Sequence, residues 1–574
     1  MQPQIIPTSE LMEELNLNKL SADLMMKTTG LSSFNEMYSQ LSEYEGVELI
    51  EEALKMMNIK VEISDEDLKK IPKWGAFITI SNHPYGLLDG VVLLQILRKI
   101  RPDYKVTANF LLGKMKPFQE LFIPVDPFKK TNFKASEKVQ RALANGDSIG
   151  LFPAGEVSTY YNSHKGIADK PWSTSALKLI KRAEVPVIPI YFHGVNSWVF
   201  HLLGRIHPLL RTFQIPKEFL NKKNHTVKVR IGQPIPVKKQ NEYEDLSSFG
   251  QMLRDKTYLL GEGMKKQKFL RPNKKAKTIA EDLIAEIPKE IIKDEINNLP
   301  ESSLLCAHGQ NEVRVAHSDA IPYTLLEIGR LREITFRAVG EGTNREVDLD
   351  KFDEYYHHLF IWNRATAQII GAYRIGVGEE IVQNIGKKGF YTNTLFKFKN
   401  DFIHVLNNGI ELGRSFVIQE KQRDAYPLFL LWKGINTYLK RNPHFKYMFG
   451  PVSISNDYSN AAKEAIIYYS YKHLYDHDIA QFVKPRKRYK MGDQIKKYID
   501  NLIQKEDIAI DELDKLVMDI EPKRFKVPVL IRQYIRLNGR MIGFNIDPKF
   551  NHCLDGLIIV NVDNIPEKIT NQLQ

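Results

Sequence analysis

The chain has 574 residues, which is too long for one hydrophobic core and predicts two large domains. Its 43% hydrophobic and 26% charged residues are typical of a globular protein, and two distant cysteines exclude a disulfide scaffold and a cysteine-rich zinc site. Lysine and arginine outnumber aspartate and glutamate by 81 to 69, and the resulting net charge of +12 favours an anionic partner such as nucleic acid, anionic lipid or an acidic carrier protein.

The sequence shows no export signal and no membrane span. Glu10, Glu13 and Glu14 lie where a signal peptide needs a basic start and an apolar core. The most apolar stretches, residues 76–97 and 185–203, are interrupted by prolines and polar residues and are not expected to cross a bilayer. We therefore expect a cytoplasmic protein, which would act on lipids only from the membrane surface.

The first half reads as a helical region followed by an α/β domain. Residues 1–70 are predicted to be mostly helical, with Ser9 as a candidate N-cap and apolar residues at helical intervals. Residues 71–262 alternate short apolar strands with helices such as SEKVQRALANG and TSALKLIKRAE. The expected strands are AFITIS, KVTANFLL, SIGLFPAG, VPVIPIYFHG and TVKVRIG. This alternation predicts a sheet with helical crossovers.

The second half reads as a different α/β domain. Residues 263–302 are strongly charged, with a helix-forming segment AEDLIAEIPKEIIKDEI, and are expected to be a charged helical linker. Residues 303–574 contain the helix-like LFLLWKGINTYLKR. The expected strands of this half are IIGAYRIGV, KYMFGPVSI, VPVLIRQYIRLNGRMIGFNI and GLIIVNV. No internal repeat is present, so the fold class is α/β with two unlike domains.

The segment NHPYGLLDG directly follows the strand AFITIS and contains Asn82, His83 and Asp89. A turn from strand to helix exposes its residues at the carboxyl edge of the sheet, where α/β proteins place their sites. The His83 imidazole can remove a hydroxyl proton there, while the Asp89 carboxylate holds the other ring nitrogen. A helix cap with a surface aspartate is the alternative interpretation of such a pair.

Two further blocks, FPAGEVS after a second strand and VPVIPI in a third, follow in order. The set resembles the lysophospholipid (glycerolipid) acyltransferase family, which has Asn-His-x4-Asp, Phe-Pro-Glu-Gly-Thr-Arg-Ser and Val-Pro-x-x-Pro blocks. The resemblance covers residues 70–240 and implies that His83 and Asp89 are catalytic. It also implies substrate-binding roles for Asn82, Phe152, Pro153, Gly155, Glu156 and Lys129.

Three departures from that family pattern bear on the substrate. Five residues separate the histidine from the aspartate instead of four, and the flexible Gly86 can absorb the extra residue. Ala154 replaces the family's glutamate, and Glu156 is a candidate for the missing carboxylate. Val157 stands where the family has an arginine that helps to hold the acceptor's phosphate, which indicates an acceptor other than a lysophosphatidic acid.

The second half carries an ordered set of charged residues: REITF at residues 332–336, DKFD at residues 350–353, Arg374 in GAYRI and the segment ELGR at residues 411–414. It resembles the acyl-homoserine-lactone synthase branch of the GNAT acyltransferases and, more closely, the ornithine-lipid N-acyltransferase (hemolysin-like) family, over residues 305–565. An amino acid whose amine attacks a thioester needs a base, for which Glu411 or the Asp350/Asp353 pair are candidates. It also needs a group that holds its carboxylate, for which Arg374 or Arg414 are candidates. For each of these residues, a purely structural role in an ion pair is the alternative interpretation. The resemblance implies substrate binding by Arg332, Phe336, Asp350, Asp353, Arg374 and Arg414.

The acyl donor is expected to be an acyl carrier protein thioester, with coenzyme A as the alternative, and no bound cofactor or metal is expected. The segment LGRSFVIQEKQRDAYPLFLLW lacks the Gly-x-Gly turn whose amides bind the pyrophosphate of coenzyme A in ordinary GNAT enzymes. A carrier protein is acidic and presents one phosphate, which suits a basic partner.

Together the two halves resemble the bifunctional aminolipid synthases that make ornithine or glycine lipids. The resemblance implies that the second half N-acylates an amino acid with a 3-hydroxyacyl group and that the first half O-acylates the 3-hydroxyl of this lyso-aminolipid. It further implies a peripheral enzyme on the inner face of the cytoplasmic membrane, without nucleic acid as a partner. Two alternatives remain: a 1-acylglycerol-3-phosphate acyltransferase with a degenerate GNAT-like domain, and a non-catalytic basic protein that binds membranes or nucleic acid.

Overall fold

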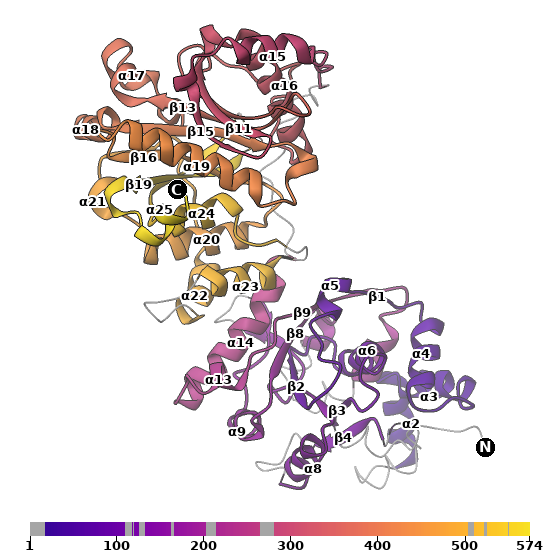
Figure 1. Ribbon diagram of the computed structural model, residues 1–574. Coiled ribbons are helices and arrows are strands. Elements are labelled where there is room, and N and C mark those ends of the chain that lie inside the picture. Colours follow the sequence, from indigo (N-terminus) through magenta and orange to yellow (C-terminus); the bar gives the residue numbers. More distant parts are fainter. Residues whose placement is uncertain are drawn as a thin grey trace. The chain divides into compact units, whose positions relative to one another are not determined.

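The computed structural model describes residues 18–109, 118, 120–125, 133–161, 166–201, 214–264, 280–502, 510–521, 525–548, 550 and 552–573. They form two compact units, coloured mainly indigo to magenta and magenta to yellow in Figure 1. The first unit is built from described residues within 1–266, 497–504 and 518–525, and the second from the remainder. Each unit contains its own sheet with packed helices, which confirms the predicted two-domain α/β fold.

The first unit contains a seven-stranded sheet with the order β1-β9-β8-β2-β5-β3-β4. Its strands are parallel except for the antiparallel pair β8 and β9. In chain order they are β1 (Lys60–Glu62), β2 (Phe77–Ser81), β3 (Lys105–Asn109), β4 (Phe122–Val125), β5 (Ser148–Leu151), β8 (Val187–His193) and β9 (Thr226–Ile231). A separate small hairpin pairs β6 (Thr159–Tyr161) with β7 (Gly166–Ala168).

Helices cover both faces of this sheet because its strands are apolar on both sides. Phe77 of β2 packs into one core and its neighbour Ile78 into the other, as the alternation of side chains along a strand requires. The first core is covered by α3 (Leu31–Gln40), α4 (Gly46–Met56), α6 (Leu87–Leu97) and α12 (Ile215–Leu220). The second is covered by α8 (Phe133–Ala144), α9 (Thr174–Ala183) and α14 (Leu246–Glu262). The short helices α2 (Lys19–Thr28), α5 (Asp65–Leu68) and α13 (Val237–Gln240) complete the unit.

The region expected to be helical therefore also contributes a strand. Helices α2 to α5 lie in residues 1–70 as predicted, but β1 pairs with β9 through Lys60 and Thr226. The sheet of the first unit thus begins before residue 71. The candidate N-cap Ser9 lies outside the described residues.

The second unit contains an eight-stranded sheet with the order β10-β11-β12-β13-β15-β16-β19-β18. β15 and β16 are parallel neighbours, but only residues 409–411 of β15 pair with residues 447–449 of β16, so these two strands do not pair with each other beyond Glu411. The strands are β10 (Leu304–His308), β11 (Asn311–His317), β12 (His357–Asn363), β13 (Gln368–Val377), β15 (Gly409–Val417), β16 (Tyr447–Ile454), β18 (Arg540–Asp547) and β19 (Cys553–Asn561). A second, two-stranded sheet joins β14 (Phe396–Phe398) to β17 (Val483–Pro485).

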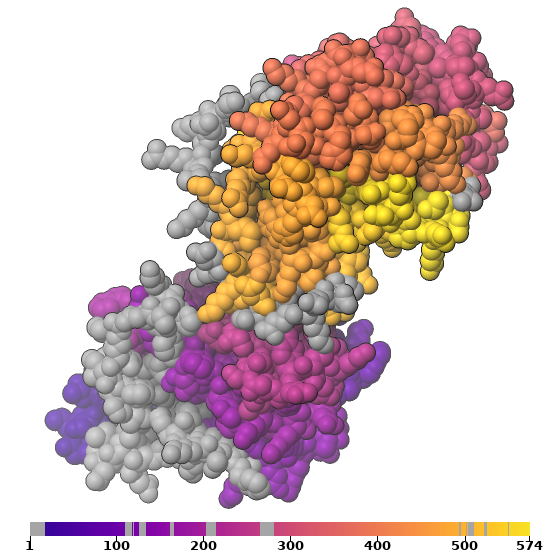
Figure 2. All heavy atoms as spheres, turned by 90° about the vertical axis from the view of Figure 1, so that its left-hand side faces the viewer, coloured from indigo at the N-terminus to yellow at the C-terminus, as the bar shows by residue number. Residues whose placement is uncertain are grey.

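Helices cover both faces of this sheet as well. Phe360 of β12 packs in the core of α15 (Lys289–Asn297) and α16 (Pro322–Ala338), whereas Leu359 lies against Gly434 of α19 (Tyr426–Arg441). The other α-helices of this unit are α17 (Gly378–Asn384), α18 (Ile403–Asn407), α20 (Asn460–His473), α21 (His477–Ala480), α24 (Val529–Arg536) and α25 (Glu567–Gln572), whereas α22 (Asp493–Leu502) and α23 (Ile510–Ile520) contribute residues to both units. Short 3-10 turns span Glu301–Ser303, Ser318–Ala320, Lys387–Gly389, Tyr391–Thr394, Asn400–Phe402, Gln419–Lys421 and Val562–Asn564. Figure 2 shows the C-terminal residues, in yellow, beside the orange segments of the same unit, in agreement with the pairing of β19 with β16.

Two predicted elements of the second half are wrong in part. The segment VPVLIRQYIRLNGRMIGFNI is not a continuous strand, because Pro528 precedes helix α24 and only Arg540–Asp547 is extended. Its buried Ile531 and Tyr534 are three residues apart, which is helical spacing. The segment AEDLIAEIPKEIIKDEI is helical only from Lys289, after Pro288, and this helix packs in the core of the second unit.

In the part of the chain that the structure describes, no helix is both long and apolar enough to cross a membrane.

Candidate active sites

The turn between β2 and α6 holds the predicted His/Asp pair. Asp89 lies in the first turn of α6 and accepts hydrogen bonds from the backbone N–H groups of Tyr85 and Gly86, at 2.9 and 3.0 Å. Gly86 adopts φ +79° and ψ −119°, a conformation that disfavours residues with a Cβ. Asp89 is therefore a helix cap, as the alternative interpretation requires, but it is completely buried and not a surface residue.

The same carboxylate also binds the histidine. Asp89 Oδ2 lies 2.9 Å from His83 Nδ1, so we assign the ring proton to Nδ1. The His83 side chain is 17% exposed, its ring stacks on Phe152 with centroids 3.9 Å apart, and its Nε2 has no hydrogen-bond partner among the described residues. Burial raises the pKa of Asp89, while its hydrogen bonds from His83, Tyr85 and Gly86 oppose this rise. The arrangement leaves Nε2 available to take a proton from a hydroxyl group.

The other predicted residues of this half have different positions. The buried Asn82 amide bonds to both the N–H and the carbonyl of Phe192, at 2.7 and 2.9 Å, and so joins the ends of β2 and β8. The carbonyl of Pro153 accepts a hydrogen bond from the N–H of Ser173, and Gly155 adopts φ +69° with open space where a Cβ would lie. Glu156 pairs with Lys170 at 3.3 Å. Lys129 lies outside the described residues.

Asp169, which was not predicted, fixes the backbone of the histidine. Its buried carboxylate accepts hydrogen bonds from the His83 N–H at 3.2 Å, from Ser158 Oγ at 2.5 Å and from Trp172 Nε1 at 3.2 Å. The Ser158 N–H donates to the carbonyl of His83 at 2.8 Å, so both backbone groups of His83 are held. Burial raises the pKa of Asp169, against the effect of these bonds.

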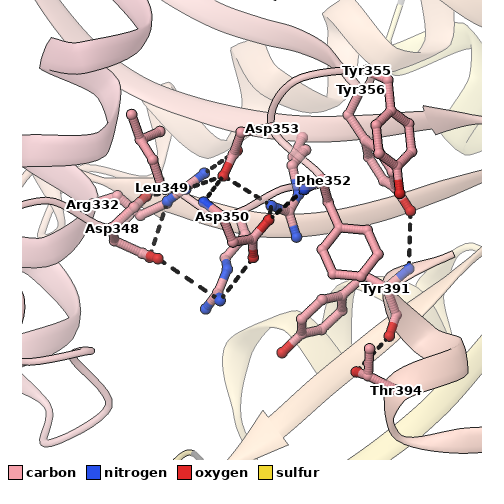
Figure 3. Close-up of polar contacts among 12 residues, drawn as sticks. Arg332, Asp348, Leu349, Asp350, Phe352, Asp353, Tyr355, Tyr356, Tyr391 and Thr394 are labelled. Atoms are coloured by element: carbon pink, nitrogen blue, oxygen red, sulfur yellow. Dashed lines mark hydrogen bonds and ion pairs between the residues drawn. The ribbon is translucent and has the colours of Figure 1, made fainter. Parts of the chain in front are cut away.

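In the second unit the predicted arginines and aspartates form one ion-pair network (Figure 3). Arg332 of α16 binds Asp348 and Asp353, each at 3.0 Å. Arg374 of β13 binds Asp350 at 2.8 Å and Asp353 at 3.1 Å. Burial alone would raise the pKa of Asp353, but the guanidinium groups of Arg332 and Arg374 hold it well below its usual range. Asp353 is therefore a charged partner of both arginines.

Arg414 of β15 is the most accessible arginine of this network. Its guanidinium lies 3.5 Å from Asp350 and 3.7 Å from Asp348, over the rings of Tyr391 and Phe550, and its side chain is 11% exposed against 1% for Arg374. Arg414 Nε is buried without a hydrogen-bond partner in the described part of the chain, and so are Nε and one terminal nitrogen of Arg374. The unused donors give the network a remaining capacity to bind a carboxylate.

Glu411 of β15 is fully enclosed. One carboxylate oxygen accepts from the Thr392 N–H at 2.6 Å, and the other accepts from the Tyr391 N–H at 3.0 Å and from the Tyr356 hydroxyl. Burial raises the pKa of Glu411, while the bonds from Thr392 and Tyr356 oppose this rise. These bonds attach the Tyr391–Thr394 turn to the sheet.

Asp555 of β19, which was not predicted, is a further buried carboxylate of the second unit. It accepts a hydrogen bond from Ser453 Oγ at 2.7 Å, and burial raises its pKa to about 7, with Asp547 acting in the same direction. Asp555 raises the pKa of Tyr391, whereas Arg414 lowers it. A carboxylate with a pKa near 7 is suited to general-base catalysis at neutral pH.

A cavity of about 730 Å³ lies along the end of β15 that does not pair with β16, between α16, α19 and α24. Its volume is within the range of about 300–1,000 Å³ found for small-molecule sites. The predicted residue Phe336 lines it, and Arg423 lies in its wall before the start of α19. The remaining lining is mainly apolar and includes Val417, Leu428, Leu431, Val529, Leu530, Leu537 and Leu573.

Two family models match the chain. The model described as Acyltransferase matches residues 18–266, which contain the His83–Asp89 pair. The model described as Acetyltransferase (GNAT) domain matches residues 331–433, which contain Arg332, Arg374 and Arg414. Both halves are thus acyltransferase domains, and the chain is an acyltransferase.

The relatives of the chain are of two kinds. It is 32% identical over 304 residues to a glycine N(alpha)-acyltransferase of Phocaeicola vulgatus, a match that covers 50% of this chain and 90% of the relative. It is 24% identical over 249 residues to a lyso-glycine lipid O-acyltransferase of Bacteroides thetaiotaomicron, covering 42% of this chain and 90% of the relative. A protein of the latter name from Phocaeicola vulgatus is 28% identical over 222 residues, covering 38% of this chain and 78% of the relative. As the resemblance to bifunctional aminolipid synthases predicts, the chain belongs to the glycine N(alpha)-acyltransferase family and joins a GNAT domain and a second acyltransferase domain in one polypeptide.

Proposed function

We propose that this enzyme makes a phosphorus-free aminolipid in two steps. The second unit transfers a 3-hydroxyacyl group to the amino group of glycine, and the first unit esterifies the 3-hydroxyl of the product with a second acyl chain. The proposal is carried by one observation: a catalytically arranged His83–Asp89 pair and an arginine-rich GNAT site occur in the same chain. The names of the two kinds of relative, which correspond to these two steps, support it.

In the first step, the glycine carboxylate binds the unused donors of Arg414 and Arg374. The ammonium group loses a proton to a carboxylate, and the resulting amine attacks the thioester carbonyl. The amide C–N bond forms, the C–S bond breaks, and the thiol leaves with a proton. We assign Asp555 as the base, because a pKa of about 7 suits proton transfer at neutral pH, whereas both oxygens of Glu411 are occupied and Asp353 is held in ion pairs.

In the second step, His83 Nε2 takes the proton of the 3-hydroxyl while its oxygen attacks the carbonyl of a second acyl thioester. The ester C–O bond forms, and the thiolate leaves with the proton that His83 returns. The buried Asp89 stabilises the imidazolium between these events, because its carboxylate is 2.9 Å from Nδ1.

The acceptor of this second step lacks a phosphate. Val157, where the glycerolipid acyltransferases have an arginine, is buried, and Glu156 next to it is acidic. This favours a lyso-aminolipid over a lysophosphatidic acid, the acceptor of the alternative 1-acylglycerol-3-phosphate acyltransferase.

We further propose that the donor is an acyl carrier protein thioester and that the enzyme works in the cytoplasm, at the inner face of the cytoplasmic membrane. The mainly apolar cavity suits an acyl chain, and Arg423 in its wall suits the single phosphate of a phosphopantetheine arm. The net charge of +12 favours the approach of an acidic carrier.

Mass spectrometry of lipids from a bacterial host that makes no aminolipids tests the function. Expression of the chain should yield N-(3-acyloxyacyl)glycine together with its mono-acylated precursor, neither of which contains phosphorus. An altered phospholipid profile without either compound would favour the 1-acylglycerol-3-phosphate acyltransferase, and an unaltered lipid profile would favour a non-catalytic protein.

A further inference from the structure

The small sheet of β14 and β17 in the second unit presents positive charges to the solvent. The two strands are antiparallel, and Lys397 of β14 lies directly opposite Lys484 of β17. Side chains alternate along a strand, so the two phenylalanines of β14 point into the core while Lys397 points outward. The backbone N–H groups of Lys399 and Arg486 continue the pairing, at 2.9 Å each, and both side chains are exposed. These four cations form a basic patch.

The charges of the basic patch are not neutralised within the fold. Among the described residues none of its four side chains forms an ion pair, and the Arg486 guanidinium donates only to a backbone carbonyl. Residues 387–400 and 482–492, which contain the patch, have nine lysines and arginines and no aspartate or glutamate. Like charges directly opposite each other in a sheet are destabilising. An unpaired basic surface of this kind indicates an anionic partner.

The position of the basic patch favours a lipid surface over an acyl carrier protein. The donor thioester has to reach the 730 Å³ cavity, and no residue of the patch lines that cavity. The patch instead adjoins the arginine site, because Arg486 Nε donates to the carbonyl of Asn393 at 2.8 Å. Asn393 belongs to the turn whose Tyr391 ring lies under the guanidinium groups of Arg374 and Arg414. The two phenylalanines of β14 are buried and offer nucleic-acid bases no stacking platform.

We propose that the basic patch binds the anionic headgroups of a phospholipid membrane. Lysine and arginine side chains near such a surface are attracted to it over about one Debye length. The inference rests on the proposed function, whose N-acyl glycine carries a long apolar chain that partitions into a bilayer. It adds the surface through which the second unit contacts this bilayer. Binding through the patch brings the Tyr391–Thr394 turn, and with it the arginine site, next to the lipid that receives the product.

The test measures binding of the purified full-length protein to lipid vesicles by co-sedimentation. Vesicles of equal parts phosphatidylglycerol and phosphatidylcholine are compared with vesicles of phosphatidylcholine alone. We expect binding to the anionic vesicles only, and its loss in about 1 M salt, where the Debye length is about 3 Å. Each positive charge near an anionic surface strengthens binding by about fivefold, so Lys484→Gln should weaken it by that factor. The triple variant Lys397→Gln, Lys399→Gln and Lys484→Gln should bind about 100-fold more weakly.

The control variant replaces Lys289 and Lys293 of α15 and Lys440 of α19 with glutamine. It removes the same charge from exposed positions outside the basic patch and should bind anionic vesicles as the wild type does. The melting temperature of the patch variant should not fall below that of the wild type, because the substitutions remove a like-charge repulsion. Lys484→Gln alone tests the patch with the smallest change to the fold.

Three results overturn the inference. One is a wild-type protein that does not bind anionic vesicles, and another is a patch variant that binds them as tightly as the control variant. The third is a patch variant that loses binding to an acyl carrier protein or to a DNA duplex but keeps its binding to vesicles. All three leave the proposed function standing, because the lipids made in the bacterial host test that function separately.

Discussion

At the scale of single residues, replacement of His83 tests the activity of the first unit separately from that of the second. Replacing it with alanine removes the atom that takes the hydroxyl proton, and general-base loss typically costs about a hundredfold to ten-thousandfold in rate. We expect His83→Ala to accumulate mono-acylated N-acyl glycine and to lose the di-acylated lipid, as measured by mass spectrometry of host lipids. His193→Ala, at an exposed histidine of the same unit, is the control and should keep both products. Normal di-acylated lipid from the His83→Ala variant would disprove the assignment.

The raised pKa of Asp555 predicts how the rate of N-acylation depends on pH. With a pKa of about 7, the Asp555 carboxyl is about half deprotonated at neutral pH, so N-acylation should rise as the pH passes through 7 and then level off. Asp555→Asn should lower the rate by about a hundredfold or more and abolish this rise. Asp563→Asn, at an exposed aspartate paired with Lys446, is the control and should change neither the rate of N-acylation nor its rise with pH.

The raised pKa of Asp555 also predicts how the stability of the fold depends on pH. Because the folded-state pKa of Asp555 lies above its unfolded value, folding disfavours the charged form, and the penalty grows as the pH rises from about 4 to 7. Asp555→Asn should therefore raise the melting temperature relative to the wild type at pH 8 and have little effect at pH 4. An equal change at both pH values would mean that Asp555 does not titrate as described.

At the scale of elements, the turn between β2 and α6 depends on its glycine. A Cβ at Gly86 would lie 3.2 Å from Val157 Cγ2, and the positive φ adds strain of about 1–3 kcal/mol. We expect Gly86→Ala to lower O-acylation, because it displaces the backbone that positions His83, and to leave N-acylation intact. Gly146→Ala is the control, since Gly146 has φ +90° but open space around its Cβ position. Gly146→Ala should lower the melting temperature, because a residue with a Cβ is strained at this φ, but it should not reduce O-acylation.

The elements also show how far the sequence could be interpreted. Short apolar runs ending in turns predicted β2, β5, β8 and β9 because such runs are long enough only for strands. The run before Arg540 was misassigned because apolar residues at positions 527–531 fit either a buried strand or one face of a helix, and packing decides between them. His83 and Asp89 could be recognised because they share one turn. Asp169 and Asp555 could not, because their partners lie 86 and 102 positions away in the sequence.

At the scale of the whole molecule, the first unit is not a continuous piece of chain. Buried Arg230 of β9 binds Asp67 at 2.8 Å and donates to the carbonyl groups of Asp519, Ile520 and Glu521. These residues belong to the first unit although they follow most of the second in the sequence. The unit is therefore closed by a late segment of the chain.

This closure predicts how the chain responds to truncation. A protein ending at residue 266 would leave the Arg230 donors without their carbonyl partners, at a cost of several kcal/mol. We expect it to unfold at a lower temperature than the first unit of the full chain and to lose O-acylation, as measured by calorimetry and by esterification of supplied N-(3-hydroxyacyl) glycine. A fully stable, active fragment would show that the late segment is dispensable.

The late position of this segment in the sequence also delays completion of the first unit during synthesis. Arg230 and Ile520 are 290 positions apart, and ribosomes add about 5–20 residues per second, so about 15–60 seconds separate their translation. During that interval Arg230 of the nascent first unit lacks the three carbonyl groups to which it donates in the finished structure. The half of the enzyme that leaves the ribosome first is completed only when nearly the whole chain has been made.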